Sequence, residues 1–349
     1  MKYLLIIAVL FAGCTSRNPG SWKGRAGDAG SKNNNSRSGN PVIRTMYTAD
    51  PSARVFNDTL WIYPSHDPDD AQWWDMVDYH VFSTTDMINY TDHGTALHLR
   101  DITWAEKYAW APDAIERNGK YYFYFPTDQD NIGVAVGDRP YGPFTDPLGK
   151  PLISRHSPGV VNNRDFIDPA VFIDDDGQAY MFVGQIDLNA IKLNEDMISY
   201  TGDVFIIEGV DYFFEAIWIH RYKGRYYLSY AGKYGEGGDK ILYAMSDNIL
   251  GPYEFKGVIF DPVNSGTNHH SIVEYKGQWY FFYHTADLAL QNIPEDSPDR
   301  EFIQWRRSVC VDYLYYNPDG TIQKIIPTRE GVKAIRGCRP AQKQSKKII

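Results

Sequence analysis

One short pattern recurs five times in this chain, a tight turn followed by a run of alternating aromatic and aliphatic residues. A turn such as Asn-Gly or Lys-Gly between two runs of this kind is typical of a β-hairpin. The copies occupy residues 57–63, 118–124, 176–182, 223–229 and 276–282. They begin 47 to 61 residues apart, which leaves enough chain for four strands each time.

Phrases outside these hairpins also repeat. Residues 85–91 resemble residues 195–201, and residues 141–144 resemble residues 251–255. Strand patterns repeating at this period, with almost no helical periodicity, predict an all-β fold: a five-bladed β-propeller of four-stranded antiparallel blades. A β-solenoid or a sandwich is the alternative, but a period of about 55 residues is long for a solenoid coil.

The N-terminal residues resemble a targeting signal rather than part of the folded structure. A basic start is followed by an apolar run of ten residues that ends at Cys14, too short to span a bilayer. Residues 11–14 resemble a bacterial lipobox, in which Cys14 would carry a lipid anchor; an ordinary cleaved signal peptide is the alternative. We therefore expect an exported, membrane-anchored lipoprotein, in the periplasm or on the cell surface of a bacterium, that touches the membrane only through its lipid.

The remaining boundaries follow from composition. Residues 15–40 are rich in Ser, Gly, Asn, Lys and Arg, which predicts a flexible linker. Residues 41–330 hold the repeats and are the predicted propeller, and residues 331–349 form a basic tail. The pattern does not indicate an oligomeric state.

Charge and cysteine content exclude several classes of protein. With 44 acidic and 35 basic residues the net charge is −9, which argues against nucleic acid as a partner. Three cysteines are too few for a disulfide framework. Cys310 and Cys338 either pair or leave Cys310 as a buried free thiol. Aromatic residues make up 15% of the chain and suit stacking on sugar rings.

Counting back nine residues from each hairpin turn locates a candidate site. In a propeller the strand entering each such hairpin is innermost, and its start faces the central axis. The positions reached are Asp50, Trp110, Asp168, Glu215 and Asn268. Three carboxylates that converge on the axis repel and raise one another's pKa values. This repulsion costs free energy, so the arrangement is not expected if the side chains served packing alone. The alternative is that the acids cap strand ends or bind water and lie too far apart to act together.

The segments around these acids resemble the catalytic signature of glycoside hydrolase family 43. They are residues 49–51, 167–169 and 214–216, with further matches at 110–113, 268–273 and 306–310. The resemblance covers nearly all of residues 41–330. It implies hydrolysis with inversion of pentose linkages, chiefly α-L-arabinofuranosides or β-D-xylosides, in plant cell-wall polysaccharide or oligosaccharide.

Carried over to this chain, the resemblance makes Asp50 the general base and Glu215 the general acid. Asp168 would be the third carboxylate, which orients the acid and raises its pKa. This agrees with the chemistry, because an inverting hydrolase needs a base for water and an acid for the leaving oxygen. Members of the family usually have Pro soon after the acid, whereas this chain has Ala216-Ile217.

The resemblance also suggests two polar sites, although the chemistry itself needs no cofactor. His269 would lie near the axis and help hold a structural calcium ion or its water shell; since calcium prefers oxygen ligands, a hydrogen-bonded core histidine is the alternative. Arg307 would contact sugar hydroxyls, and the alternative is a surface ion pair for either Arg306 or Arg307.

Aromatic residues complete the expected site. Trp110 shares the axial register, and its ring is expected to form the apolar wall of the sugar subsite. Phe214 directly precedes Glu215 in the sequence. Trp74 is either a sugar platform or buried between blades, and Trp104 has the same ambiguity. Residues 289–302 are predicted to form a lid-like loop.

Three functions remain open at this point. The first is an exo-acting arabinofuranosidase or xylosidase. The second is an endo-arabinanase or a galactofuranose or galactan side-chain hydrolase of the same fold. The third is a non-catalytic sugar-binding propeller, which would not need all three carboxylates.

Overall fold

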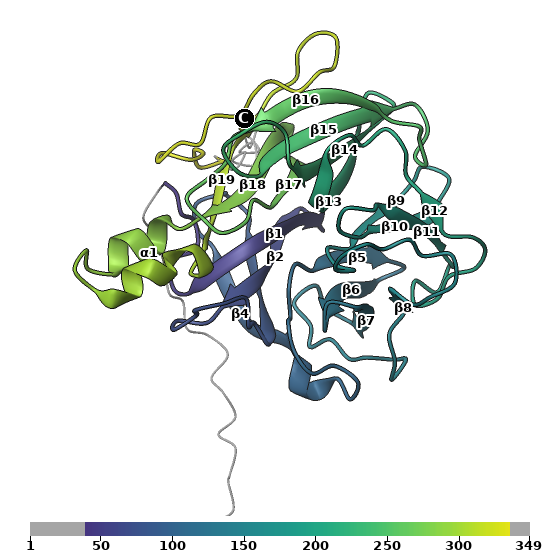
Figure 1. Ribbon diagram of the computed structural model, residues 1–349, viewed down its shortest axis with the longest axis horizontal. Helices are drawn as coiled ribbons and strands as arrows, with labels where there is room; N and C mark the ends of the chain where they lie inside the picture. Colours follow the sequence, from purple (N-terminus) through teal and green to yellow (C-terminus); the bar gives the residue numbers. More distant parts are fainter. Residues whose placement is uncertain (1–38, 336–349) are drawn as a thin grey trace, which may run out of the picture. The chain divides into compact units, whose positions relative to one another are not determined.

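The computed structural model describes residues 39–335, which form the predicted five-bladed β-propeller (Figure 1). Blade one contains β1 (Tyr47–Phe56), β2 (Thr59–Asp67), β3 (Asp78–Thr84) and β4 (Thr91–His98). Blade two contains β5 (Asp113–Arg117), β6 (Lys120–Thr127), β7 (Asn131–Gly137) and β8 (Ile153–Ser154). Blade three contains β9 (Ala170–Ile173), β10 (Ala179–Val183), β11 (Asn189–Leu193) and β12 (Phe205–Ile206).

The last two blades complete the ring. Blade four contains β13 (Phe213–Tyr222), β14 (Arg225–Gly232), β15 (Lys240–Ser246) and β16 (Glu254–Phe260). Blade five contains β17 (His270–Tyr275), β18 (Gln278–Thr285) and β19 (Ser308–Leu314). The first strands of the blades, β1, β5, β9, β13 and β17, contact one another in a closed ring, so they are innermost as predicted.

The repeated turns form because their residues accept a left-handed backbone. Asn118 and Gly119 have φ values of 55° and 75°, and Lys223 and Gly224 have 48° and 80°. Positive φ at both central residues gives a two-residue hairpin whose twist matches that of the flanking strands. The inner hairpin of each of these blades is therefore fixed locally, and with it the register of the axial residues.

The core lies between the blades. Alternate residues of each strand face one neighbouring blade, so the aromatic runs of the repeats interleave across every junction. Between blades one and two, the ring of Phe123 lies 5.0 Å from that of Tyr79 and 6.0 Å from that of Tyr63. All three side chains are fully buried, and burial of each contributes about 1.5–3 kcal/mol.

Blade five departs from the four-stranded prediction, because its sheet has three strands in the described part of the chain. The segment that leads into blade one lies along the edge of β19. The backbone N–H of Val42 donates to the carbonyl of Val309 at 2.8 Å, and the side-chain amide of Asn40 bonds to both backbone groups of Val311. The start of the propeller thus covers the last strand and closes the ring.

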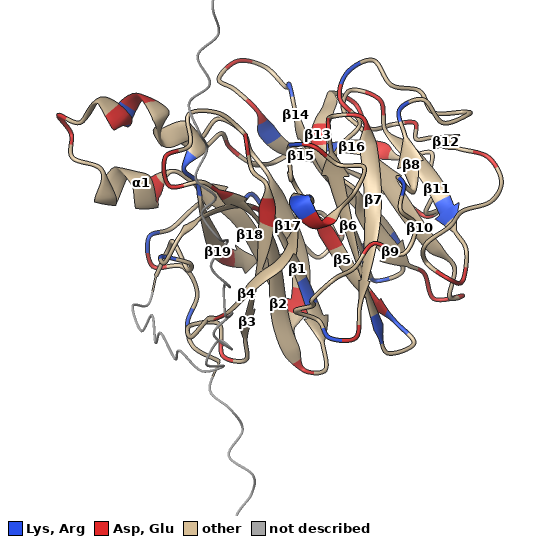
Figure 2. Ribbon diagram, turned by 90° about the horizontal axis from the view of Figure 1, so that it is seen from below, with Lys and Arg blue, Asp and Glu red and all other residues tan. Residues whose placement is uncertain are grey.

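The prediction of a loop over 289–302 was wrong. This insertion between β18 and β19 contains α1 (Asp287–Asn292) and a 3₁₀ helix, η2 (Pro298–Trp305). Leu288 and Ala289 pack on Tyr47 of β1, with Ile293 and Ile303 around them. Figure 2 shows the insertion beside the blades, with several acidic residues on it.

The ends of the chain are only partly described. Cys14, most of the linker and Cys338 lie outside the described residues, and Cys310 is a buried free cysteine. Val332, at the start of the predicted basic tail, is buried against the core between blades one and five. Within residues 39–335 no helix has the length and apolar character to cross a membrane.

Candidate active site

The three axial carboxylates lie together at one pocket, as the register predicted. Asp50, Asp168 and Glu215 line a pocket of about 330 Å³ and are 5%, 5% and 8% exposed. They come from β1, from the residues just before β9, and from β13, so three different blades supply them. The alternative that they lie too far apart to share a site is therefore wrong.

Irregular backbone turns these side chains toward the axis. Asp50 and Asp168 have φ values of 49° and 58°, and Ala216, next to Glu215, has 60°. The pairing of β1 with β2 shifts register at Asp50, and that of β13 with β14 shifts around Glu215. Left-handed backbone at residues other than glycine costs about 1–3 kcal/mol each and is typical of functional sites.

The backbone conformation excludes proline directly after Glu215. Proline fixes φ near −65° and has no N–H. Ala216 has a positive φ, and its N–H donates to Oδ2 of Asp168 at 2.8 Å. A proline at position 216 would lose both features.

Asp50 is held in its ionised form. Its Oδ1 accepts from Nη1 of Arg307 at 2.9 Å and its Oδ2 from Oγ of Ser65 at 2.7 Å. Burial opposes ionisation, but the Arg307 guanidinium, together with His284, His269 and the Ser65 hydrogen bond, outweighs it and lowers the pKa of Asp50 to about 2. The backbone N–H of Asp50 donates to Nδ1 of His284, whose pKa is lowered by burial to about 3, so this imidazole is neutral.

Glu215 has the opposite environment. Burial raises its pKa to about 7, against the hydrogen bond that Nε2 of Gln185 donates to its Oε2 at 2.5 Å; the charges of Asp239 and Asp50 raise the pKa further. Burial, followed by repulsion from Glu215, also raises the pKa of Asp168 well above its usual value. The two carboxyls therefore retain a proton near neutral pH, while Asp50 carries a negative charge.

The polar contacts of Arg307 are with Asp50 and with the residues around Asp50. It is 1% exposed, and its guanidinium pairs through Nε and Nη2 with Asp67 at 2.9 and 2.8 Å. Its Nη1 binds Asp50 and Thr267. The surface alternative is wrong for both arginines, because Arg306 is also buried and bonds to Asp299 and to the carbonyl of Ala71.

The predicted aromatic residues lie around the same pocket. Trp74, Trp110 and Phe214 all line it, and Nε1 of Trp110 donates to the carbonyl of Trp74 at 2.7 Å. Trp73 joins them with 51% of its surface exposed. Trp104 instead packs between blades one and two, stacked on Phe125.

Several pocket residues were not predicted, because the count reached only the innermost strands. Gln185, Lys233 and Asp239 lie at the ends of outer strands and also line the pocket. Hairpin register could have found the partners of Asp50. Ala49 pairs with Ser65 and Tyr47 with Asp67 across β1 and β2, which places these two polar side chains beside the base.

His269 lies at the pocket, but it does not fit direct coordination of calcium. Its Nδ1 accepts from the N–H of His270 at 2.9 Å, so the proton of the neutral ring is on Nε2. Burial lowers the pKa of His269 and keeps it neutral. Nε2 is buried without a hydrogen-bond partner, 3.8 Å from Oδ2 of Asp168, and offers an N–H where a calcium ligand would need a lone pair.

Comparison with known proteins finds similarity to glycoside hydrolases along most of this chain. The sequence profile described as "Glycosyl hydrolases family 43" matches residues 38–322. The xylosidase/arabinosidase 43A of Humicola insolens is 37% identical over 81% of this chain and 98% of its own length. A solved α-L-arabinofuranosidase from Clostridium thermocellum is 43% identical, with a TM-score of 0.71 over 85% of this chain and 98% of that one.

A second solved structure bears on substrate and metal. It is a β-xylosidase/α-arabinofuranosidase from a compost microbial metagenome, described as a complex with xylotriose in a calcium-free form. It is 37% identical to this chain, with a TM-score of 0.71 over 84% of this chain and 98% of that one.

Proposed function

This chain belongs to glycosyl hydrolases family 43 and is a glycoside hydrolase of the β-xylosidase/α-arabinofuranosidase type, and we propose that it works by single displacement with Asp50 as base and Glu215 as acid. One observation carries the assignment of roles. Of the carboxyls at one pocket, Asp50 is kept ionised by Arg307, whereas Glu215 has a pKa of about 7. An inverting hydrolase needs this contrast at neutral pH.

In the proposed reaction the sugar enters the pocket with its glycosidic oxygen near Glu215. Asp50 removes a proton from a water molecule, whose oxygen attacks the anomeric carbon. Glu215 donates its proton to the leaving oxygen as the carbon–oxygen bond breaks. Asp50 ends protonated and Glu215 ionised, and exchange with solvent restores both.

Asp168 is proposed as a positioning residue. It accepts the N–H of Ala216, the residue after the acid, and so fixes the backbone that carries Glu215. Its carboxyl also couples electrostatically to that of Glu215, which favours a shared proton. With its N–H on Nε2, His269 would contact a calcium ion only through the water shell of that ion.

For the substrate, we propose terminal xylosyl or arabinofuranosyl units of xylo-oligosaccharides and arabinoxylan. The pocket offers tryptophan faces beside charged groups, which suits a pentose ring with its hydroxyls. Initial rates on nitrophenyl β-D-xyloside, α-L-arabinofuranoside and β-D-galactofuranoside, followed by xylotriose and branched arabinan, test this. Preference for galactofuranoside, or release of only internal fragments from arabinan, would contradict it.

We also propose that Cys14 anchors the protein to a bacterial membrane. Support comes from residues 11–14 and the apolar run before them. Incorporation of a radiolabelled fatty acid into the wild type, and its loss in Cys14→Ser, is the expected result. Equal labelling of both would place the lipid elsewhere than Cys14, and no labelling of the wild type would indicate an ordinary signal peptide; either result would contradict the anchor.

A further inference from the structure

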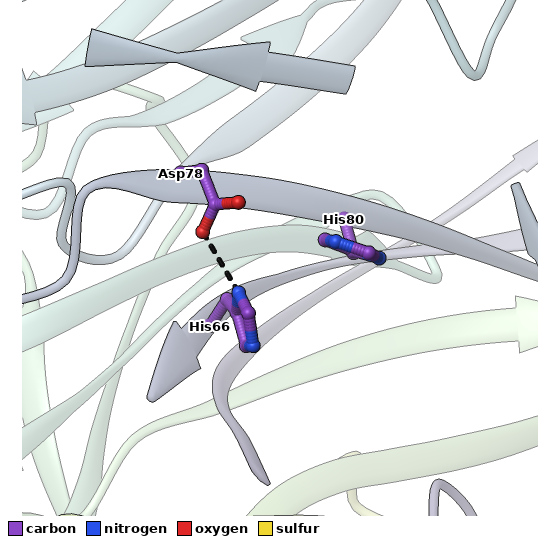
Figure 3. A group of neighbouring side chains, drawn as sticks. All are labelled: His66, Asp78 and His80. Carbon is purple, nitrogen blue, oxygen red and sulfur yellow. Dashed lines mark hydrogen bonds and ion pairs between the residues drawn. The ribbon is translucent and has the colours of Figure 1, made fainter. Parts of the chain in front are cut away.

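A separate group of potential metal ligands lies on blade one. His66 is near the end of β2, Asp78 begins β3, and His80 lies two residues further along β3. Each offers a ligand atom, and these atoms lie within 4.8 Å of one another (Figure 3). None of the three residues lines the active-site pocket.

We propose that these three residues bind one divalent transition-metal ion of the Zn²⁺ class. Two imidazoles and one carboxylate with an open fourth position suit zinc, whereas calcium and magnesium prefer ligand sets made only of oxygen. The side chains of His66, Asp78 and His80 are 24%, 18% and 15% exposed, so an ion and a water molecule can reach them.

The side chains are already partly arranged for an ion. Nδ1 of His66 lies 2.7 Å from Oδ1 of Asp78, and Figure 3 shows the ring of His80 beside this pair. Nδ1 of His80 lies 3.2 Å from a carboxylate oxygen of Asp92 on β4 (Thr91–His98). A carboxylate behind an imidazole orients the ring and strengthens its other nitrogen as a ligand. In His80 this nitrogen is Nε2, which lies 3.2 Å from Oγ1 of Thr95, so a bound ion would replace that contact.

Only a small rearrangement is required. Ligand atoms about 2.0–2.1 Å from a tetrahedral zinc ion lie about 3.4 Å apart, and the present separations are within 4.8 Å, so none must shorten by more than roughly 1.4 Å. The rings of His66 and His80 have centroids 5.1 Å apart, and rotation of these partly exposed side chains can supply the change.

The position of the cluster gives the ion a structural consequence. Residues 68–77 connect β2 to β3, so His66 and Asp78 flank the two ends of this loop. The loop carries Trp73 and Trp74 into the pocket. An ion bound by both strands would therefore fasten the base of the loop that presents these tryptophans.

Direct binding measurements on the full chain test the site. Titration with Zn²⁺ by calorimetry should show one ion per chain held at this cluster, and Co²⁺ should give the visible absorption of a four-coordinate site. His80→Gln should weaken Zn²⁺ binding at least about tenfold, as loss of a ligand does. The matched control is His156→Gln, which changes an exposed histidine of blade two and should bind as the wild type does.

Three results would overturn the proposal. They are no saturable binding in the wild type, a Co²⁺ spectrum without tetrahedral intensity, and unchanged affinity in a folded His80→Gln variant. The last would move the ion to residues outside this cluster. Circular dichroism of each variant shows whether it is folded, and the wild-type Co²⁺ spectrum tests the site without any variant.

The loop itself supplies a readout that needs no substrate and so does not depend on the proposed function. Chymotrypsin cleaves after tryptophan, and Trp73 is half exposed. Zn²⁺ should slow cleavage at Trp73 and Trp74 several-fold in the wild type and in His156→Gln, as followed by the mass of the N-terminal fragment. The rate in His80→Gln should not respond; equal protection of all three proteins would contradict a clamp at the loop base.

Discussion

Two carboxyls of similar chemistry acquire opposite protonation states from their neighbours. Asp50 touches a guanidinium that Asp67 holds in place, whereas Glu215 has an amide donor and further carboxylates around it. Since both are buried, burial alone would raise both pKa values. The cation beside Asp50 therefore distinguishes base from acid.

Removing either proton-transfer group should abolish turnover without unfolding the protein. Asp50→Asn and Glu215→Gln keep the shape of the side chain but remove a transfer that contributes about 10²–10⁴ in rate. Single-turnover rates on xylotriose measure the loss, and Glu195→Gln, at an exposed position of blade three, is the control. Near wild-type rates in either variant would refute the assignment of roles.

The pH dependence follows from the two pKa values. Activity requires ionised Asp50 and protonated Glu215, so kcat/KM should fall as pH rises through about 7 and persist in acid until Asp50 protonates near pH 2 or the protein unfolds. Asp168→Asn removes the carboxyl that repels Glu215 and titrates together with it, so the remaining acid should ionise more easily and the basic limb should move to lower pH. A basic limb that does not move would remove Asp168 from this role.

The sequence predicted those residues of the pocket that a single geometric rule could locate. Counting back from the hairpin turns found Asp50, Asp168 and Glu215, because the innermost strands share one register. The same count could not show that Arg307 faces the base, since its contacts with Asp67 and Asp50 join residues about 240 and 257 positions apart. Nor could it find Gln185, which reaches the pocket from an outer strand.

At the scale of elements, bulges at the inner strand ends aim the acids. Regular pairing from the hairpin turn would send side chains alternately to the two faces of a blade. The shift between Ala49 and Ser52 and the shifts around Glu215 interrupt this alternation and leave Asp50 and Glu215 at the axis. Turn chemistry predicts the hairpins, whereas the bulges depend on contacts between blades, so the sequence did not predict them.

Substitution of Ala216 tests the bulge that follows Glu215. Ala216→Pro cannot adopt a φ of 60° or donate to Asp168, and should destabilise the protein by at least about 1 kcal/mol and lower turnover. Ala216→Gly keeps the N–H and accepts the positive φ, so it should retain turnover. Urea unfolding and kcat measure both effects; equal behaviour of the two variants would show that the bulge is unimportant.

For the whole molecule, closure of the ring depends on the entering segment. Asn40 is 8% exposed, and its side chain bonds to the N–H and carbonyl of Val311 and to the carbonyl of Thr328. It thereby pairs the open edge of β19, the edge that a fourth strand would otherwise cover. The composition of residues 15–40 suggested a linker up to this position, and only the structure shows that its last residue belongs to the closure.

Asn40→Ala should therefore weaken the ring as a whole. Buried backbone groups left without a partner cost about 1–3 kcal/mol, and the loss should appear as a lower urea midpoint with an unchanged active site. Asn89→Ala, at an exposed amide of blade one, is the matched control and should change stability by less than about 0.5 kcal/mol. Equal midpoints for Asn40→Ala and the wild type would show that the closure does not need this amide.

The arrangement of the blades also determines the stereochemistry that we expect. Asp50 is on blade one and Glu215 on blade four, and both β1 and β13 contact β17 of blade five between them. The two acids therefore face each other obliquely across the pocket with one blade between. We expect the gap to be nearer the roughly 6.5–9.5 Å that admits a water molecule than the roughly 5–5.5 Å of a carboxylate nucleophile.

Single displacement through that water inverts the anomeric carbon. Proton NMR during hydrolysis of an α-L-arabinofuranoside should show the β-anomer of arabinose first, followed by slow mutarotation, and a β-D-xyloside should give α-xylose first. Early appearance of the anomer of the substrate, or a sugar trapped covalently on Asp50, would refute the mechanism. That outcome would leave the fold and the substrate class intact, because the ring of blades and the pocket do not depend on which face of the sugar is attacked.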